Sequence, residues 1–238
     1  MNYPPPTSPA PAAARNRRSG RTPANRKKRK SGSGFSLWQW AVLALLLIGL
    51  IYAVLRLGQA NASLSQLYQE RQLAQEKYEQ TVRNHQVKYR DLIEKYSAEY
   101  NLNPAFVSAI IMQESGYDPR AVSSKGAMGL MQFMPNTFDW VKKNCGYRSA
   151  DVDVLYQPEA AIKMGCYLLN YITKQLSSDD PVLVACAYHA GWGNVPAWIE
   201  NYSTDGKTLA VSQIPKSDTR TYAGRVLNSY AIYLQHYY

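Results

Sequence analysis

The longest uninterrupted apolar stretch of the chain runs from Leu37 to Leu55, with Gln39 as its only strongly polar member. No charged residue follows until Arg56. About twenty apolar residues in a helix are enough to cross the hydrocarbon core of a bilayer. Tryptophan near the start of the stretch and tyrosine near its end suit the headgroup regions. The pattern therefore predicts a transmembrane helix over residues 35–56.

Two other interpretations of this stretch stay open. A buried core helix is disfavoured, because core helices rarely run this long without a polar stripe. A cleaved signal peptide is the stronger rival, although the stretch is long for its apolar region. Residues 53–56 form a poor small-residue cleavage site, and residues 58–62 are a better candidate.

Residues 57–87 are polar, rich in Gln, Glu, Ala, Lys and Arg, and free of proline. This composition supports helix. The apolar positions are too irregular for a clear heptad repeat. We expect a helical stalk, in the form of either a short coiled coil or a plain solvated spacer.

Helical signals dominate residues 88–238, and no segment alternates in polarity as a strand would. Proline at the first helical position and an Asn or Asp before it mark several helix starts. The pattern predicts a mainly α domain with long functional loops at 115–135 and 189–220. The expected helices are Tyr89–Tyr100, one capped by Asn103 and begun by Pro104, Pro158–Lys174, Asp180–Tyr188 and Thr219–Gln235.

Charge is distributed unevenly along the 238 residues, whose formal net charge is +10. Nine of the 27 basic residues lie in residues 1–34, which contain no acidic residue. The rest of the chain contains 18 basic and 17 acidic residues. The folded part is therefore nearly neutral, which disfavours a nucleic-acid-binding domain. Residues 1–34 are also rich in Pro, Ala, Ser and Gly, a composition that predicts a disordered tail. The positive-inside rule places this basic tail in the cytoplasm and residues 57 onward outside.

The chain has three cysteines, at positions 145, 166 and 186. Their spacing contains no CxxC pair, so we expect no zinc site. One disulfide with one free thiol and three buried thiols are both compatible with this odd number.

Glu114 is the candidate chemical group. It directly follows the apolar segment 106–113 and precedes Gly116 and Pro119, residue types that commonly end a helix. Helical spacing places it on the face of Ile110 and Val107, so it should lie against apolar packing. Burial disfavours the charged form of a carboxyl group, which raises its pKa and suits it to act as a general acid.

Three segments in order, residues 113–135, 187–195 and 217–222, closely resemble the motifs of the soluble-lytic-transglycosylase family, whose catalytic domain is lysozyme-like. The resemblance extends over residues 88–238. It implies a lysozyme-like catalytic domain there, behind the membrane helix and stalk.

The resemblance also implies roles for individual residues. Glu114 would be the catalytic acid, and Tyr222 would place its hydroxyl near that carboxyl. The residues implied to line the glycan subsites are Ser123, Gln132, Met134, Tyr188 and His189. His189 stands where the family commonly has Asn, and Asp218 stands where it usually has Glu.

A conventional glycosidase needs a second carboxylate, and none is well placed. Asp118 sits in a Tyr-Asp-Pro turn and suits a turn role; Asp218 suits a structural one near Tyr222. The resemblance implies instead that the substrate supplies the nucleophile, with no metal and no cofactor. We also expect Gly126 and Gly129 to let the backbone pass close to a sugar, with plain turn geometry as the alternative.

The sequence thus predicts a single-pass membrane protein with an extracytoplasmic domain that cuts peptidoglycan between N-acetylmuramic acid (MurNAc) and N-acetylglucosamine (GlcNAc). The product would be a 1,6-anhydro end. Its expected partners are glycan strands and the membrane, and no protein partner is indicated. A hydrolytic muramidase and a non-catalytic glycan-binding scaffold are the alternatives.

Overall fold

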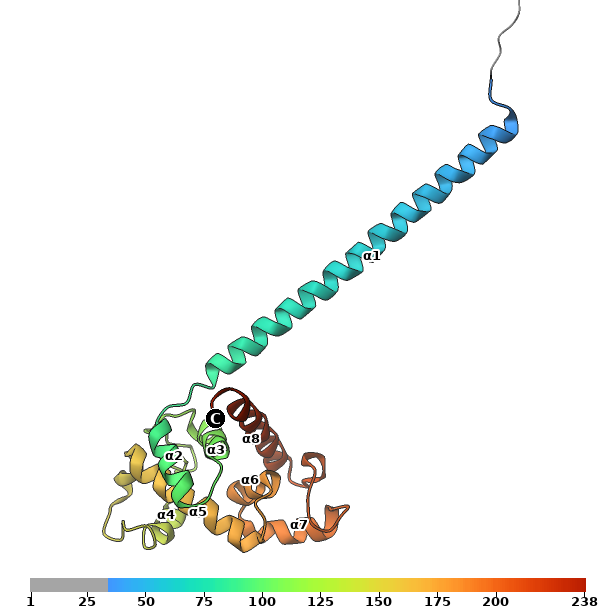
Figure 1. Cartoon of the computed structure of the whole chain (residues 1–238). Helices are drawn as coiled ribbons and strands as arrows, with labels where there is room; N and C mark the ends of the chain where they lie inside the picture. Colours follow the sequence, from blue (N-terminus) through green and yellow to red (C-terminus); the bar gives the residue numbers. More distant parts are fainter. Residues whose placement is uncertain (1–33) are drawn as a thin grey trace, which may run out of the picture. The chain divides into compact units, whose positions relative to one another are not determined.

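The computed structural model of this protein describes residues 34–238 (Figure 1). The predicted basic tail lies outside these residues, apart from Gly34. The chain divides into two units at residues 65 and 66, and each is considered separately. Helix α1, Leu37–Asn84, passes through this boundary.

Helix α1 contains residues 37–56 of the predicted membrane segment and residues 57–84 of the predicted stalk in one continuous stretch. Among residues 34–238 it is the one helix long and apolar enough to cross a membrane, and its apolar window has a mean hydropathy of 2.4. None of that window is buried against the protein, unlike a core helix.

The second unit is built from helices, and the described residues form no strand. The prediction of a mainly α domain is therefore confirmed. After α1 the elements are α2 Arg90–Glu99, α3 Pro104–Ser115, α4 Pro135–Val141, the 3-10 helix η1 Val152–Tyr156, α5 Pro158–Leu176, α6 Pro181–Ala190, η2 Trp192–Asn194, α7 Val195–Tyr202, η3 Val211–Gln213 and α8 Ser217–His236.

Helix α3 is the centre of this unit. Every residue from Ala105 to Ile111 is buried, and α3 packs most extensively against α8 and also against α2 (Figure 1). Helix α8 packs in turn on α6, which packs on α5. Because the apolar segment of α3 is buried on all sides, its C-terminal turn is the place where it first approaches solvent.

Side-chain caps fix where two of the predicted helices begin. The Asn103 side chain accepts a hydrogen bond from the Ala105 amide at 2.9 Å, at the start of α3. The Asp180 carboxylate accepts from the Val182 and Leu183 amides at 2.9 and 3.0 Å, at the start of α6. These bonds satisfy amides that have no partner within the helix.

The prediction of an irregular connection over 189–220 is wrong in part, because η2, α7 and η3 lie in it. Helix α4 and η1 were likewise not predicted. The three cysteines are buried and free, so no disulfide joins them.

Gly165 on α5 allows the loop between α3 and α4 to pack closely. A Cβ at this position would overlap the Sδ of Met131, a fully buried residue of the loop before α4. Gly224 on α8 differs, because a Cβ there would lie 3.7 Å from the Val211 Cγ1, an ordinary contact.

We expect Gly165→Ala to lower the free energy of unfolding by about 1–3 kcal/mol, because the added methyl group overpacks a filled core. Gly224→Ala is the matched control. It should be neutral or stabilising by up to about 1 kcal/mol, because it replaces a helical glycine where space exists. Urea denaturation of the two variants measures both effects, and equal stability would contradict the packing argument.

Candidate functional site

Glu114 lies in the last turn of α3, where the helix leaves the core. Ile110 and Ile111, one turn earlier, are fully buried, whereas Glu114 itself retains partial exposure. Gly116 ends the helix, with its amide donating to the Met112 carbonyl at 3.1 Å. The carboxyl group is therefore placed at the border between apolar packing and solvent.

Tyr222 on α8 donates its hydroxyl to Oε1 of Glu114 at 2.6 Å. Burial raises the pKa of Glu114 to about 7, although this hydrogen bond acts in the opposite direction. The pKa of Tyr222 is raised well above its ordinary value, by burial and by the neighbouring Glu114 charge. Tyr222 therefore remains a neutral donor while Glu114 exchanges its proton near neutral pH.

His189, at the end of α6, covers the ring of Tyr222. The two rings stack with centroids 4.5 Å apart and an interplanar angle of 25°. Nδ1 of His189 lies 3.1 Å from Oγ1 of the buried Thr219. Burial lowers the pKa of His189, so the imidazole stacked on Tyr222 is neutral at neutral pH.

The loop between α3 and α4 is held by its own backbone. The Met128 and Phe133 amides and carbonyls bond to each other at 3.0 and 2.9 Å, and the Gly129 amide donates to the Ala121 carbonyl at 2.9 Å. The Ser123 hydroxyl accepts from the Ala127 amide at 3.0 Å. These internal hydrogen bonds give the loop a defined shape.

Two side chains fasten this loop beside Glu114. Ser115, the next residue on α3, donates its hydroxyl to the Leu130 carbonyl at 2.8 Å. Tyr188 on α6 donates to the Met131 carbonyl at 2.7 Å. The Glu114 charge also contributes to the raised pKa of Tyr188, after burial. Tyr188 is therefore close to the carboxyl, while its hydroxyl is used to hold the loop.

The predicted sugar-contacting residues of the loop are placed differently from one another. Gln132 donates its amide nitrogen to the Ala121 and Gly129 carbonyls, both at 3.1 Å. The amide nitrogen of Gln132 is thus used within the loop, and its side-chain oxygen is left as an acceptor. Met134 is 42% exposed at the start of α4, so it is not a core methionine.

Gly129 is required by packing inside the protein. It has a φ of 74°, and a Cβ there would overlap the carbonyl oxygen of Leu155. The backbone at Gly129 thus lies close to η1. The turn geometry and this packing explain why a glycine is needed here.

One hydrogen-bonded chain that ends next to Glu114 was not predicted from the sequence. Gln113 donates to the hydroxyl oxygen of the buried Ser229 at 2.8 Å. That hydroxyl lies 3.0 Å from Nε2 of His85, and Nδ1 of His85 lies 2.7 Å from the Thr81 carbonyl at the end of α1. Long-range polar contacts of this kind have no local pattern in a sequence.

An aromatic cluster near His189 was also missed. Trp140 on α4 lies 4.6 Å from Tyr171 on α5, centroid to centroid, and Tyr171 lies 5.3 Å from Trp192 on η2. Trp192 is 38% exposed. Within residues 34–238, no group of three or more His, Cys, Asp or Glu side chains is arranged to hold a metal ion.

The family model described as Transglycosylase SLT domain matches residues 91–211, just over half of the chain. The soluble lytic murein transglycosylase of Salmonella typhimurium is 34% identical over 153 residues, covering 63% of this chain and 23% of that protein. The endo-type membrane-bound lytic murein transglycosylase A of Klebsiella pneumoniae is 29% identical over 149 residues, covering 60% of this chain and 73% of that protein. The chain thus spans about a quarter of the first relative's length.

Solved structures show the same likeness. The 70 kDa soluble lytic transglycosylase of Escherichia coli superposes with a TM-score of 0.57 at 31% identity, covering 63% of this chain and 24% of that one. An inactive mutant of the Pseudomonas aeruginosa lytic transglycosylase Slt, with Gln in place of a Glu, gives 0.56 at 30% identity, covering 62% and 24%.

We expect Tyr222→Phe to raise the pKa of Glu114 above its present value of about 7. The substitution removes the hydrogen bond that favours the carboxylate and leaves the burial that opposes it. Carbon-13 NMR titration of the glutamate side-chain carboxyl groups measures the change. Tyr230→Phe, on the same helix, is the control and should leave this pKa in place. A lower pKa in Tyr222→Phe would overturn the account.

Proposed function

This chain belongs to the family of transglycosylase SLT domains, and from that premise we propose that it is a membrane-anchored lytic transglycosylase of peptidoglycan. It would cleave the bond between MurNAc and GlcNAc and leave a 1,6-anhydro end. The observation that carries the proposal is the partly buried Glu114 carboxyl group. Its pKa is about 7, and it accepts a hydrogen bond from the neutral hydroxyl of Tyr222.

In the first step Glu114 acts as a general acid. With a pKa of about 7 it carries its proton in a large share of molecules at neutral pH. Tyr222 occupies Oε1, so the proton resides on Oε2, from which it passes to the glycosidic oxygen. The bond from C1 of MurNAc to that oxygen breaks, and GlcNAc leaves with the proton.

In the second step the carboxylate of Glu114 acts as a base. It takes the proton of the C6 hydroxyl of the same MurNAc residue, and that oxygen bonds to C1. The ring closes, Glu114 regains its proton, and no water is consumed. Tyr222 donates to Oε1 throughout and stabilises the charged intermediate state of the carboxyl group.

The acids nearest to this site in sequence support a one-carboxylate scheme. Asp118 accepts from the Arg120 amide at 2.8 Å within its turn. Asp218 accepts from the Thr219 amide at 2.7 Å and pairs with Lys216 at 3.5 Å. Both carboxylates are thus engaged in local contacts of their own, and Glu114 is the acid proposed for both steps.

Glycan contacts are proposed for residues around this carboxyl group. Met134 offers an exposed apolar wall, and His189 offers the ring nitrogen not directed at Thr219. Gln132 keeps its carbonyl oxygen for a sugar donor, while its nitrogen holds the loop. Ser123 keeps its own proton to donate, because its oxygen accepts from the Ala127 amide. Tyr188 would act through the loop that it fastens.

The apolar part of α1 is proposed to span the membrane once, with the basic tail in the cytoplasm. Its hydropathy and exposed side chains are suited to lipid. The basic residues of the tail would lie against anionic headgroups, where each contributes about 1 kcal/mol. The domain would then face the compartment that contains peptidoglycan.

We expect Glu114→Gln to reduce the release of fragments from purified peptidoglycan by at least about a hundredfold, because the amide neither donates nor accepts the required proton. A mutant of the Pseudomonas aeruginosa lytic transglycosylase Slt that has Gln in place of a Glu is inactive. Mass spectrometry of the fragments is the measurement, and the unaltered protein should give 1,6-anhydro ends.

Glu200→Gln is the matched control, because Glu200 is exposed on α7. It should retain full activity. Fragments with reducing ends in place of anhydro ends would show that the protein is a hydrolytic muramidase. Wall binding without fragments from the unaltered protein would favour a glycan-binding scaffold, and full activity of Glu114→Gln would refute the catalytic assignment.

The proposed orientation predicts a protease pattern. Protease added outside intact spheroplasts should digest residues 88–238 and leave an epitope tag at the N-terminus protected. Digestion should reach the tag only after the membrane is permeabilised. A tag digested in intact spheroplasts would contradict the orientation, and a tag lost from the mature protein would indicate a cleaved signal peptide.

A further inference from the structure

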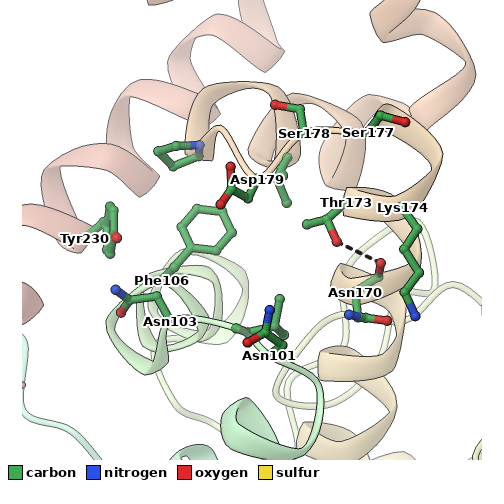
Figure 2. Close-up of a pocket in the computed structure, with 13 residues that line it drawn as sticks. Asn101, Asn103, Phe106, Asn170, Thr173, Lys174, Ser177, Ser178, Asp179 and Tyr230 are labelled. Atoms are coloured by element: carbon green, nitrogen blue, oxygen red, sulfur yellow. Dashed lines mark hydrogen bonds between the residues drawn. The ribbon is translucent and has the colours of Figure 1, made fainter.

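A cavity of about 550 Å³ lies on the second unit, away from Glu114. It is lined by residues of the turn between α2 and α3, the start of α3, the last turns of α5, the turn into α6, and α8 (Figure 2). The volume is within the range of pockets that hold small ligands. Phe106 lines it and precedes Glu114 by eight residues on α3, a separation of about 12 Å along the helix. The cavity is thus distinct from the Glu114 site.

Amide and hydroxyl side chains form much of its lining, and some are fixed by bonds within the protein. Asn170 donates its amide to the Tyr100 carbonyl at 2.8 Å, and the Thr173 hydroxyl donates to the Asn170 carbonyl at 2.8 Å. These bonds leave the side-chain oxygen of Asn170 as an acceptor. Asn101 and Ser177 add further polar groups at the rim.

Two opposite charges line the cavity without neutralising each other. Asp179 lies near the rings of Phe106 and Tyr230, and Lys174 lies across from them on α5 (Figure 2). The two rings meet edge to face, with centroids 5.5 Å apart. The Asp179 charge contributes, after burial, to the raised pKa of Tyr230. No ion pair within 4.0 Å joins Lys174 or Asp179 to another residue among positions 34–238.

We propose that this cavity binds the peptide part of peptidoglycan, a short peptide that carries both a free ammonium group and carboxylates. The ammonium group would lie between Asp179 and the two aromatic rings, where carboxylate and ring faces both attract a cation. A carboxylate would pair with Lys174, and the amide and hydroxyl groups between them would bond to the peptide backbone. The identity of this ligand rests on the function proposed above.

The charge pattern favours a peptide over a second stretch of glycan. A neutral sugar would satisfy the amides and hydroxyls and would leave Lys174 and Asp179 unpaired. A zwitterionic peptide pairs both. Binding here would hold a strand by its peptide while the glycan lies at Glu114, which adds affinity through linkage rather than through new contacts at the catalytic site.

Isothermal titration calorimetry with the full-length protein in detergent tests peptide binding in this cavity. The probe is the free stem tetrapeptide of peptidoglycan. We expect Asp179→Asn and Lys174→Gln each to weaken binding by roughly tenfold, the effect of about 1.4 kcal/mol. Asp151→Asn, at an exposed residue outside the cavity, should bind as the unaltered protein does. Acetylation of the amino group that is proposed to pair with Asp179 should weaken binding of the peptide to the unaltered protein. It should cause no further loss of affinity in Asp179→Asn.

Unchanged affinity in both cavity variants, or equal affinity for the acetylated peptide, would overturn the proposal. Binding of chitotriose, a peptide-free oligosaccharide, should not change in either variant. Loss of that binding as well would show a general structural defect and would also count against the site. The tetrapeptide contains no glycosidic bond, so its binding stands or falls independently of whether Glu114→Gln abolishes lysis.

Discussion

The hydrogen bond from Tyr222 to Glu114 depends on the packing of α3 against α8, and the rest of the site is arranged around it. The two residues are separated by 108 positions in the chain, yet their oxygen atoms lie 2.6 Å apart. Seven consecutive buried residues hold α3 in the core. This packing fixes the position of its last turn along α8. Small changes in this helix packing would move the carboxyl group away from its donor, because the 2.6 Å contact tolerates little displacement.

The loop after α3 is the second constraint, because a carboxyl group at a helix end needs a wall that excludes water. Its backbone groups pair with each other, and Ser115 and Tyr188 attach it to α3 and α6. Gln113, Ser229 and His85 connect the same helix turn to α8 and to the end of α1. Neither of these two polar networks uses the Glu114 carboxyl group.

The sequence predicts the long helices well, because their signals are local. Asn103 and Asp180 cap the helices that they were expected to cap. Helices α4 and α7 also begin with proline in the first turn, but they have seven and eight residues, too few to show an apolar period. The internal bonds of Gln132 depend on carbonyls whose positions only the folded loop defines. Local patterns thus give the elements, and contacts between distant segments give the site.

The choice of tyrosine as the partner of Glu114 follows from the need for one carboxyl group to act first as an acid and then as a base. A lysine or arginine at this position would hold the pKa of the carboxyl group low and leave it without a proton to give. An apolar residue would leave burial unopposed, and the carboxylate would be too costly to form. A neutral hydroxyl donor offsets part of the burial effect and leaves a pKa of about 7, near the pH at which both protonation states are accessible. The imidazole of His189 on the face of Tyr222 is compatible with this balance, because in its neutral form it adds no positive charge next to the tyrosine that donates to the carboxyl group.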